Sequence, residues 1–281
     1  MTAKIIDGKK IADNLLLELR QKIKKLERAP GLAVVLIGED EASKLYVRNK
    51  KRACHKVGIN FYDYYCGGAC FSDITEEKIL ETIDFLNNDP EIDGMIVQLP
   101  IPKKFDTEKI INRIKPEKDV DGFCEVNKNK FLAGDEGVIS PLIQAISEAI
   151  KSTGQNLEGK MAVVVSNNEA YSQTRKKDLE QLGLEVKIIK PEKGFENETK
   201  KADVLVVIAG QSNLIKKSMV KDGAIVIDVG TNFIGENKWT GDVDLAVAEI
   251  ASYITPVPGG VGPLTVVMLL NNVYEMAKNH Q

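Results

Sequence analysis

Short apolar runs alternate with helical patterns along most of this chain. Apolar residues recur at helical spacing over residues 11–26, and the strand-like run Leu32–Ile37 follows them. A second helix is expected from about Asp40 to Val57, where Gly58 can cap it. Further strands are predicted at Ile59–Tyr65, Gly94–Leu99, Met161–Val165, Leu184–Ile189, Asp203–Ala209 and Ala224–Val229. Strands of this length, separated by helices, predict an α/β protein with parallel sheets covered on both faces.

The region from Lys115 to Gly137 interrupts this pattern, because it has no clear periodicity and many polar residues. We interpret it as the crossing between two α/β lobes. The 281 residues, 43% of them hydrophobic, can bury the cores of two such lobes, although one larger domain would also fit this length. A cleft between lobes is the usual place for a ligand.

Charge and hydropathy limit the partners of the protein. The 38 basic and 41 acidic residues nearly cancel, so no strong field favours nucleic acid or an anionic membrane. The longest apolar runs have only the length of a strand, and the first twenty residues contain no signal-peptide h-region. We therefore expect a cytoplasmic protein with a small-molecule partner.

The cysteines and histidines do not form a metal-binding pattern. One C-x₃-C pair is present, but no second pair or histidine cluster completes a zinc set. We interpret the cysteines as reduced thiols and expect no metal. The residues concerned are Cys54, Cys66, Cys70, Cys124, His55 and His280.

Two motifs combine a helix and a strand end with polar side chains. Tyr46 and Lys50 are four residues apart, so on a helix they share a face and can point into one pocket. A solvated, lysine-rich helix explains the same spacing without any function. In GMIVQLPIP, the strand ends at Gln98, where parallel sheets place binding residues, and Pro100 stops the sheet. The alternative is that Gln98 is simply a polar strand end.

Two further motifs lie in loops. In PEKDVDGF, Asp119 and Asp121 flank Val120 before a glycine, and turn chemistry alone can account for Asp-Gly. In TPVPGGVGPLT, stiff prolines alternate with permissive glycines, and Pro263 suits the first turn of a helix through Thr265–Ala277. Bare backbone from such a loop can lie against a flat ligand.

These motifs, together with VIDVGTN and GDVD, occur in one order that resembles the methylenetetrahydrofolate dehydrogenase/cyclohydrolase family over nearly the whole chain. The resemblance implies a folate-binding lobe (residues 1–118 with 264–281, so that the last helix returns to it) and a Rossmann-type NADP-binding lobe (119–263). It implies homodimers formed through the nucleotide lobes. It also implies oxidation of 5,10-methylenetetrahydrofolate to the methenyl cation, followed by hydrolysis to 10-formyltetrahydrofolate.

The resemblance assigns roles to residues of the folate lobe. Lys50 matches the catalytic lysine, which acts as acid or base when partly desolvated. Gln98 would orient it. Tyr46 would stack its ring on the benzoyl group of folate and, as a further catalytic candidate, could support the lysine. Asp121 matches the acid that binds the pterin N–H donors. The loop residues expected along the substrate cleft are Pro258, Gly259 and Gly260.

The chain departs from the family pattern at the nucleotide turn. Where the family has Gly-Arg-Ser after a strand, this chain has Ser166, Asn167 and Asn168, and Glu169 adds a negative charge. Bulkier side chains and the lost arginine both oppose a pyrophosphate. Later strands keep the family pattern. The candidate cofactor residues are Ser166, Asn167, Asn168, Gly210 and Thr231.

We therefore predict that the turn still forms a strand–turn–helix but binds NADP poorly or not at all. Arg175 and nearby lysines could supply positive charge from new directions, which is the argument against this prediction. Our leading hypothesis is an enzyme of folate one-carbon metabolism in which the cyclohydrolase step is retained and the NADP-dependent step is weakened. The alternatives are a folate-binding or regulatory protein without turnover, and an α/β dehydrogenase for another small substrate.

Overall fold

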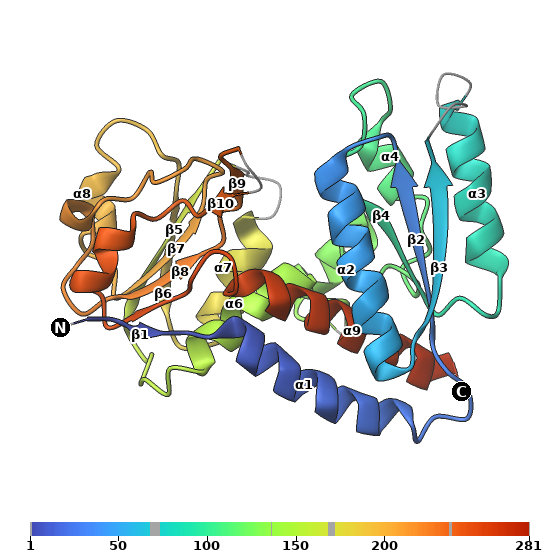
Figure 1. The fold of residues 1–281 in the computed structure, drawn as a ribbon, viewed down its shortest axis with the longest axis horizontal. Coiled ribbons are helices and arrows are strands. Elements are labelled where there is room, and N and C mark those ends of the chain that lie inside the picture. The colour runs from blue at the N-terminus through green and yellow to red at the C-terminus, as the bar shows by residue number, and fades with distance from the viewer. Residues whose placement is uncertain (1, 68–73, 136, 168–171, 236–237, 281) are drawn as a thin grey trace. The chain divides into compact units, whose positions relative to one another are not determined.

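A computed structural model describes residues 2–67, 74–135, 137–167, 172–235 and 238–280. The chain divides into two compact units, named here by their sheets (Figure 1). The three-stranded lobe comprises Asp13–Pro141 and Val266–Gln281, and the six-stranded lobe comprises Met1–Ala12 and Leu142–Thr265. The ends of the chain thus belong to different lobes.

The three-stranded lobe is built on a parallel sheet in the order β3-β2-β4. Its strands are β2 (Gly31–Ile37), β3 (Asn60–Cys66) and β4 (Gly94–Gln98). Every residue of the central strand β2 is buried, because helices cover both faces. The helices with residues in this lobe are α1 (Gly8–Ile23), α2 (Glu41–Val57), α3 (Glu76–Asn88), α4 (Thr107–Ile111), α5 (Glu125–Ala133) and α9 (Val261–His280).

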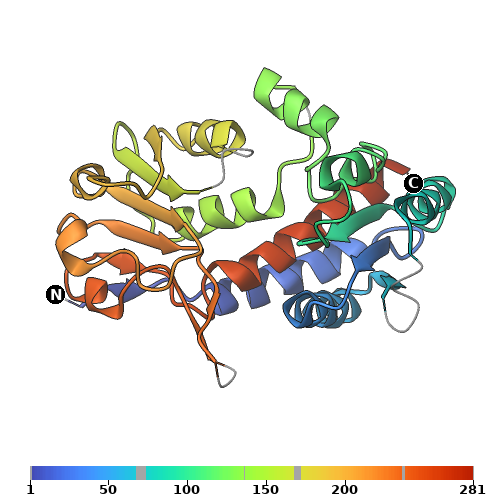
Figure 2. The ribbon, with the colours of Figure 1, turned by 90° about the horizontal axis from the view of Figure 1, so that it is seen from above.

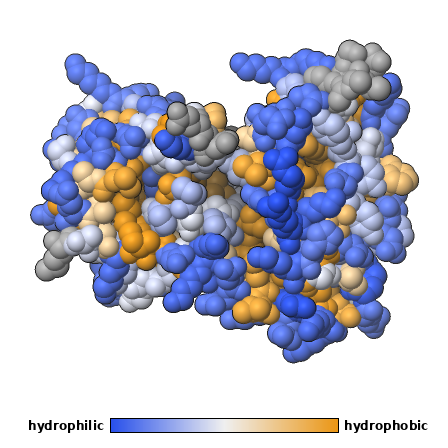
Figure 3. Space-filling view, in the orientation of Figure 1, coloured by the Kyte–Doolittle hydropathy of each residue, from blue (hydrophilic) through white to orange (hydrophobic). Residues whose placement is uncertain are grey.

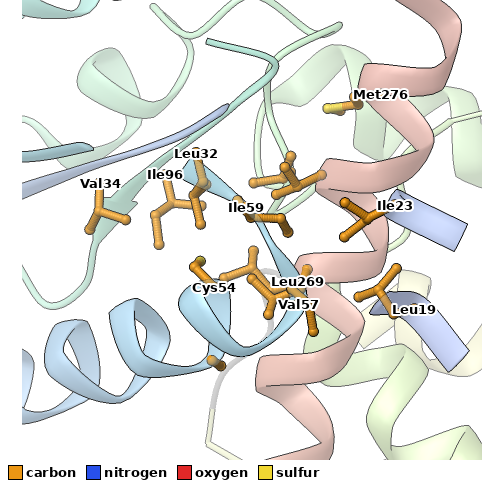
Figure 4. Packing of buried hydrophobic residues seen from close by; sticks show 14 of the residues in the cluster. Leu19, Ile23, Leu32, Val34, Cys54, Val57, Ile59, Ile96, Leu269 and Met276 are labelled. Atoms are coloured by element: carbon orange, nitrogen blue, oxygen red, sulfur yellow. The ribbon is translucent and has the colours of Figure 1, made fainter. Parts of the chain in front are cut away.

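Alternate residues of β2 pack into two separate cores, as the period of a strand requires. Leu32 and Val34 belong to a cluster with α1, α2 and α9, which is the core shown in Figure 4. Ala33 and Val35 belong to a second cluster, made with α3 and the segment around α4. Leu269 of α9 is 1% exposed in the first cluster, so the last helix completes this lobe, as the resemblance implies.

Helix α2 begins and ends where local chemistry dictates. The Asp40 carboxylate accepts a hydrogen bond from the Ser43 N–H at 2.7 Å, which caps the amino end. Gly58 closes the helix with φ of 91°, a left-handed conformation that favours glycine. The predicted helix and its glycine cap are therefore confirmed.

The six-stranded lobe carries a wholly parallel sheet in the order β1-β11-β8-β7-β5-β6. Its strands are β1 (Lys4–Ile5), β5 (Met161–Ser166), β6 (Glu185–Ile189), β7 (Val204–Ile208), β8 (Ile225–Asp228) and β11 (Tyr253–Ile254). Its helices are α6 (Pro141–Lys151), α7 (Ser172–Glu180), α8 (Glu196–Thr199) and the 3₁₀ segments Lys217–Met219 and Leu245–Glu249. A small antiparallel pair, β9 (Asn232–Phe233) with β10 (Trp239–Thr240), extends from this lobe (Figure 2). The predicted α/β class with parallel sheets is confirmed.

Several elements differ from the sequence-based expectation, among them the short strands β1 and β11, which the sequence did not predict. Helix α9 spans Val261–His280, so Pro263 lies in its first turn as predicted, and the helix continues three residues beyond the expected Ala277. Helix α5 forms inside the region that shows no periodicity. It buries Phe131 and the polar Asn127, and Asn127 donates to the Pro116 carbonyl at 2.9 Å and to Asp119 at 3.1 Å.

Within the described part of the chain, no helix combines the length and apolarity needed to cross a membrane. Cys54, Cys66 and Cys124 are free thiols, and Cys70 lies outside the described residues.

Candidate active site

A lysine and a glutamine from different elements of the three-stranded lobe form a hydrogen-bonded pair. Lys50 Nζ on α2 donates to Oε1 of Gln98, the last residue of β4, at 2.8 Å. Gln98 Nε2 donates in turn to the Leu99 carbonyl at 2.7 Å. Because a carbonyl can only accept, this second bond fixes the amide so that its oxygen faces the lysine. The structure thus brings together two predicted site residues that lie 48 positions apart.

Lys50 differs from the other lysines of α2. Lys44 and Lys51 pair with carboxylates at the protein surface, and Figure 3 shows hydrophilic side chains along this helix. Lys50 bonds instead to a neutral amide, and burial lowers its pKa below the ordinary value of 10.5, opposed by the nearby charge of Asp121. The reading of the motif as a merely solvated, lysine-rich helix therefore fits Lys44 and Lys51 but not Lys50.

Two other side chains of α2 accompany Lys50. The Tyr46 ring, one turn earlier, is 41% exposed and so has surface left for a ligand. Ser43, two turns before Lys50, is buried, and its Oγ has no hydrogen-bond partner among the described residues. A buried hydroxyl without a partner is costly and marks a place where a ligand or water can bind. Sequence reasoning missed Ser43, although its spacing of three and seven from Tyr46 and Lys50 is the helical signal that could have found it.

The Asp-Val-Asp segment places its two acids in different surroundings. Asp119 is buried and accepts from the Cys124 N–H at 2.9 Å, so it has a structural role at the start of α5. Asp121 is half-buried, and no described residue donates a hydrogen bond to its carboxylate. Burial raises its pKa to about 6, although Lys50 lowers it. Asp121 therefore keeps its acceptor capacity for a ligand.

Close packing fixes the backbone around Asp121. Val120 lies so close to β4 that a Cβ at Gly94 would come within 2.5 Å of it. Gly122 has φ of 65°, and a Cβ there would lie 2.5 Å from the Val138 carbonyl. Asn272 Nδ2, on α9, donates to the carbonyls of Val120 at 2.9 Å and Ile139 at 3.0 Å. Sequence reasoning missed Asn272, because a single polar residue in an apolar helix does not reveal its distant partners.

The glycine-rich loop lies in the six-stranded lobe. The Gly259 carbonyl accepts from the Lys9 N–H at 3.0 Å, and Gly259 has φ of 108°, which requires glycine. A Cβ at Gly8 would lie 1.9 Å from the Gly260 carbonyl oxygen. Pro258 follows a cis peptide bond. The loop is thus packed against the start of α1.

The candidate cofactor residues surround the carboxyl ends of parallel strands in the six-stranded lobe. Ser166 ends β5 and is buried, and its Oγ accepts from the buried Arg175 at 3.2 Å. Asn167 Nδ2 donates to the carbonyl of Ala209, just after β7, at 2.7 Å. Asn168 lies outside the described residues. This end of a parallel sheet is where such folds bind dinucleotides.

Two candidates of the later strands also occur at this edge. Gly210 has φ of 64°, and its N–H donates to Asp242 at 2.9 Å. Thr231 is exposed, three residues after the end of β8. Among the described residues, no group of three or more His, Cys, Asp or Glu side chains could hold a metal ion.

Comparison with known proteins assigns the chain to a family. The model of the tetrahydrofolate dehydrogenase/cyclohydrolase catalytic domain matches residues 6–121, and that of the family's NAD(P)-binding domain matches residues 141–281. The protein belongs to this family. The resemblance seen in the motifs is therefore confirmed, and the alternative of an unrelated α/β dehydrogenase is not supported.

Individual relatives match over their full length. The bifunctional protein FolD of Bacillus subtilis is 42% identical, with 99% of each chain covered. The bifunctional FolD of Campylobacter jejuni has a TM-score of 0.93 at 36% identity, covering 99% of this chain and 100% of that one. The Trypanosoma brucei family member, solved with NADP cofactor and an inhibitor, has a TM-score of 0.93 at 30% identity, covering 99% and 98%.

Proposed function

We propose that this protein acts in folate one-carbon metabolism and catalyses the two reactions for which its family is named. It oxidises 5,10-methylenetetrahydrofolate with a nicotinamide nucleotide, and it hydrolyses the resulting methenyl cation to 10-formyltetrahydrofolate. The observation that carries the proposal is the hydrogen bond from the half-buried Lys50 to Gln98, in a chain that belongs to this family.

Lys50 is proposed as the acid and base of hydrolysis. Burial lowers its pKa, so its ammonium can release a proton more easily than an exposed lysine. In its neutral form it accepts a proton from the water that forms a bond to the bridging carbon. It then returns a proton to the pterin-ring nitrogen as the bond from that carbon breaks. The remaining hydroxyl proton is released to solvent as the formyl carbonyl forms on the other nitrogen, so hydrolysis of the cation releases one proton overall. No net proton remains on the lysine from these two transfers.

Gln98 is proposed as the group that holds Lys50 in place, and Tyr46 as the ring that stacks on the benzoyl group. A neutral amide bonds to the lysine in either protonation state, because its oxygen accepts from the ammonium and from the amine. Its own orientation is fixed by the Leu99 carbonyl, so the lysine meets the same acceptor throughout the reaction.

Asp121 is proposed to bind the pterin. The pterin edge presents neighbouring N–H donors, and an ionised carboxylate accepts two such bonds at once. No described residue donates a hydrogen bond to the Asp121 carboxylate, so both of its oxygens can accept from the pterin. Asn272 donates to the carbonyl of the adjacent Val120 and holds this segment in place. Pro258, Gly259 and Gly260 are proposed to line the substrate site from their loop.

The nucleotide is proposed to bind at the carboxyl ends of β5, β7 and β8. A domain model for NAD(P) binding matches this part of the chain. No described residue of the turn replaces the lost arginine at position 167, and Asn167 uses its amide to bind the Ala209 carbonyl instead. We therefore expect NADP to bind weakly and the oxidation to be the slower of the two activities.

We also propose a homodimer formed through the six-stranded lobe. Phe233, the last residue of β9, and the following Ile234 are 59% and 56% exposed, and Phe233 contacts Trp239 at a ring-centroid distance of 5.1 Å. Exposed apolar side chains in one place are typical of a surface that another chain covers. Light scattering on the wild type and on Phe233→Ser tests this: the wild type should have twice the mass of one chain, and the variant should be smaller.

Hydrolysis of methenyltetrahydrofolate by the purified protein, without nucleotide, tests the main proposal. Steady turnover that yields 10-formyltetrahydrofolate is expected. Tight binding without turnover would instead indicate a folate-binding or regulatory protein.

A further inference from the structure

Backbone groups that follow β7 converge on one buried carboxylate, that of Asp242. Its Oδ2 accepts from the N–H groups of Ala209 at 2.7 Å and Gly210 at 2.9 Å, and its Oδ1 from those of Gln211 and the Asn232 side chain, each at 2.8 Å. Asp242 is 0% exposed. Three successive backbone N–H groups on one anion form the arrangement by which loops bind phosphate, but here the anion belongs to the protein.

A second carboxylate fixes the first. Asp228, the last residue of β8, is 4% exposed and accepts from the N–H groups of Gly230 at 2.9 Å, Asp242 at 3.0 Å and Val243 at 2.9 Å. The approach is so close that a Cβ at Gly241 would lie 1.8 Å from Asp228 Oδ2. The Gly-Asp-Val segment is therefore held against the end of β8 by its own backbone.

The same set of hydrogen bonds extends to the turn after β5. Asn167 Nδ2 donates to the Ala209 carbonyl, and the N–H of Ala209 donates to Asp242. The ends of β5, β7 and β8 are thus joined in one connected network. Two residues implied to bind the cofactor, Asn167 and Gly210, are members of it.

We propose that Asp242 is a positioning residue for the dinucleotide, and this rests on the proposed nucleotide-dependent function. It acts through the loop after β7 rather than on the ligand. The N–H groups of residues 209–211 donate to Asp242 and so do not bind the nucleotide themselves. The loop contributes to nucleotide binding through its backbone conformation and through the groups that face away from Asp242. A carboxylate can accept all four hydrogen bonds. An asparagine amide has only one oxygen, and its NH₂ group would face two of these N–H donors and could not accept from them.

The test is Asp242→Asn, which preserves size and removes charge and acceptor capacity. Nucleotide binding is measured by calorimetry with NADP and NAD up to millimolar concentration, and hydrolysis of methenyltetrahydrofolate is measured in the same preparations. We expect affinity for the better nucleotide to fall by about tenfold or more, the size of effect that loss of hydrogen bonds to a charged group produces. Hydrolysis should stay at the wild-type rate, because it needs no nucleotide.

The matched control is Asp244→Asn in the same motif. Asp244 pairs with Lys216 at 2.9 Å and takes no part in the network, so this variant should bind nucleotide like the wild type. If Asp242→Asn does not fold, Asn232→Ala removes one donor to Asp242 and should weaken binding by a smaller factor.

Unchanged nucleotide affinity in a folded, hydrolytically active Asp242→Asn or Asn232→Ala would overturn the positioning role alone. Failure of the wild type to bind either nucleotide would overturn the nucleotide-dependent part of the proposed function, and the positioning role with it.

Discussion

Each lobe has a carboxylate beside its sheet, half-buried Asp121 in one and buried Asp242 in the other, and the two differ in their hydrogen bonds. Asp242 in the six-stranded lobe accepts four hydrogen bonds from its own chain. Asp121 in the three-stranded lobe accepts none from the described residues, and burial raises its pKa to about 6. A saturated carboxylate has no capacity left for a ligand and works as scaffold. A carboxylate without hydrogen-bond donors lowers the stability of the fold but can accept hydrogen bonds from a ligand, which is typical of a functional site.

The same contrast holds for the side chains around each carboxylate. Lys50 has a single acceptor, Gln98, and Ser43 Oγ has no partner among the described residues. Asn167 instead contributes its amide to the network of the six-stranded lobe. The comparison teaches that the groups around Asp121 stay open for a ligand, whereas the polar groups around Asp242 hold strand ends together.

Replacing Lys50 by methionine should have the largest effect. The change keeps the length of the side chain and removes the proton that the mechanism transfers, so the hydrolysis rate should fall by about 10²- to 10⁴-fold. Lys51→Met is the matched control, because Lys51 pairs with the exposed Asp63 at 3.0 Å and makes no hydrogen bond to Gln98. Steady-state kinetics on both variants measure this, and normal hydrolysis by Lys50→Met would remove Lys50 from the mechanism.

Asp121→Ala should weaken binding of a folate analogue. The pterin donors would lose a charged acceptor, which costs about 1.5–3 kcal/mol, or roughly 10- to 150-fold in affinity. Asp63→Ala, an exposed position of the same lobe, should bind like the wild type. Titration calorimetry gives both constants, and equal affinity of the Asp121 variant and the wild type would reject the proposed pose.

Asn272→Ala should lower stability and, through the Val120 carbonyl, also loosen the segment that carries Asp121. Two buried carbonyls would lose their donor, and the expected loss in the free energy of unfolding is about 1–3 kcal/mol. Asn271→Ala makes the same change next to it on α9, where no hydrogen bond to these carbonyls is lost. If urea unfolding gives equal stabilities for the two variants, the anchoring role of Asn272 is wrong.

The pH dependence of binding should be a smaller effect. Asp121 must be ionised to accept from the pterin, and its pKa is raised to about 6, so affinity should rise as the pH increases through 6 and then level off. Below pH 6 the affinity for the folate ligand should change by at most about tenfold per pH unit. Asp121→Asn should lack this rise, and Lys50→Met should move the midpoint upward, because the lysine charge lowers the pKa of Asp121.

The ionisation of Asp121 has the opposite effect on folding stability: it favours ligand binding but lowers the free energy of unfolding. The pKa of Asp121 is raised above its ordinary value of 3.8, so the fold favours the protonated form. This contribution is fully present below about pH 4 and is lost as the pH rises through 6. Urea unfolding of the wild type and Asp121→Asn across this range should show the difference, and parallel curves would contradict it.

Sequence alone predicted the elements whose causes are local. The central strands β2, β5, β7 and β8 are largely continuous apolar runs, and α2 carries its own cap at Asp40 and its own stop at Gly58. The pairing of Lys50 with Gln98 was within reach, because helical spacing and a strand end each marked one partner. The family resemblance then placed both in one site.

The rest depends on contacts between distant residues. Helix α5 has almost no amphipathic pattern, and Asn127 holds it through partners before Asp121 in the chain. Asn272 reaches residues more than 130 positions away. The network around Asp242 was foreseen only as a motif, since three successive backbone donors on one carboxylate leave no mark in the side-chain pattern.

The central claim is that the folate site is intact while the nucleotide turn has changed. Calorimetric titration of the wild type with a folate analogue, NADP and NAD in turn tests both halves of this claim. We predict clear binding of the analogue and half-saturation by NADP well above the micromolar range. Micromolar affinity for NADP, or no binding of the folate analogue, would contradict it.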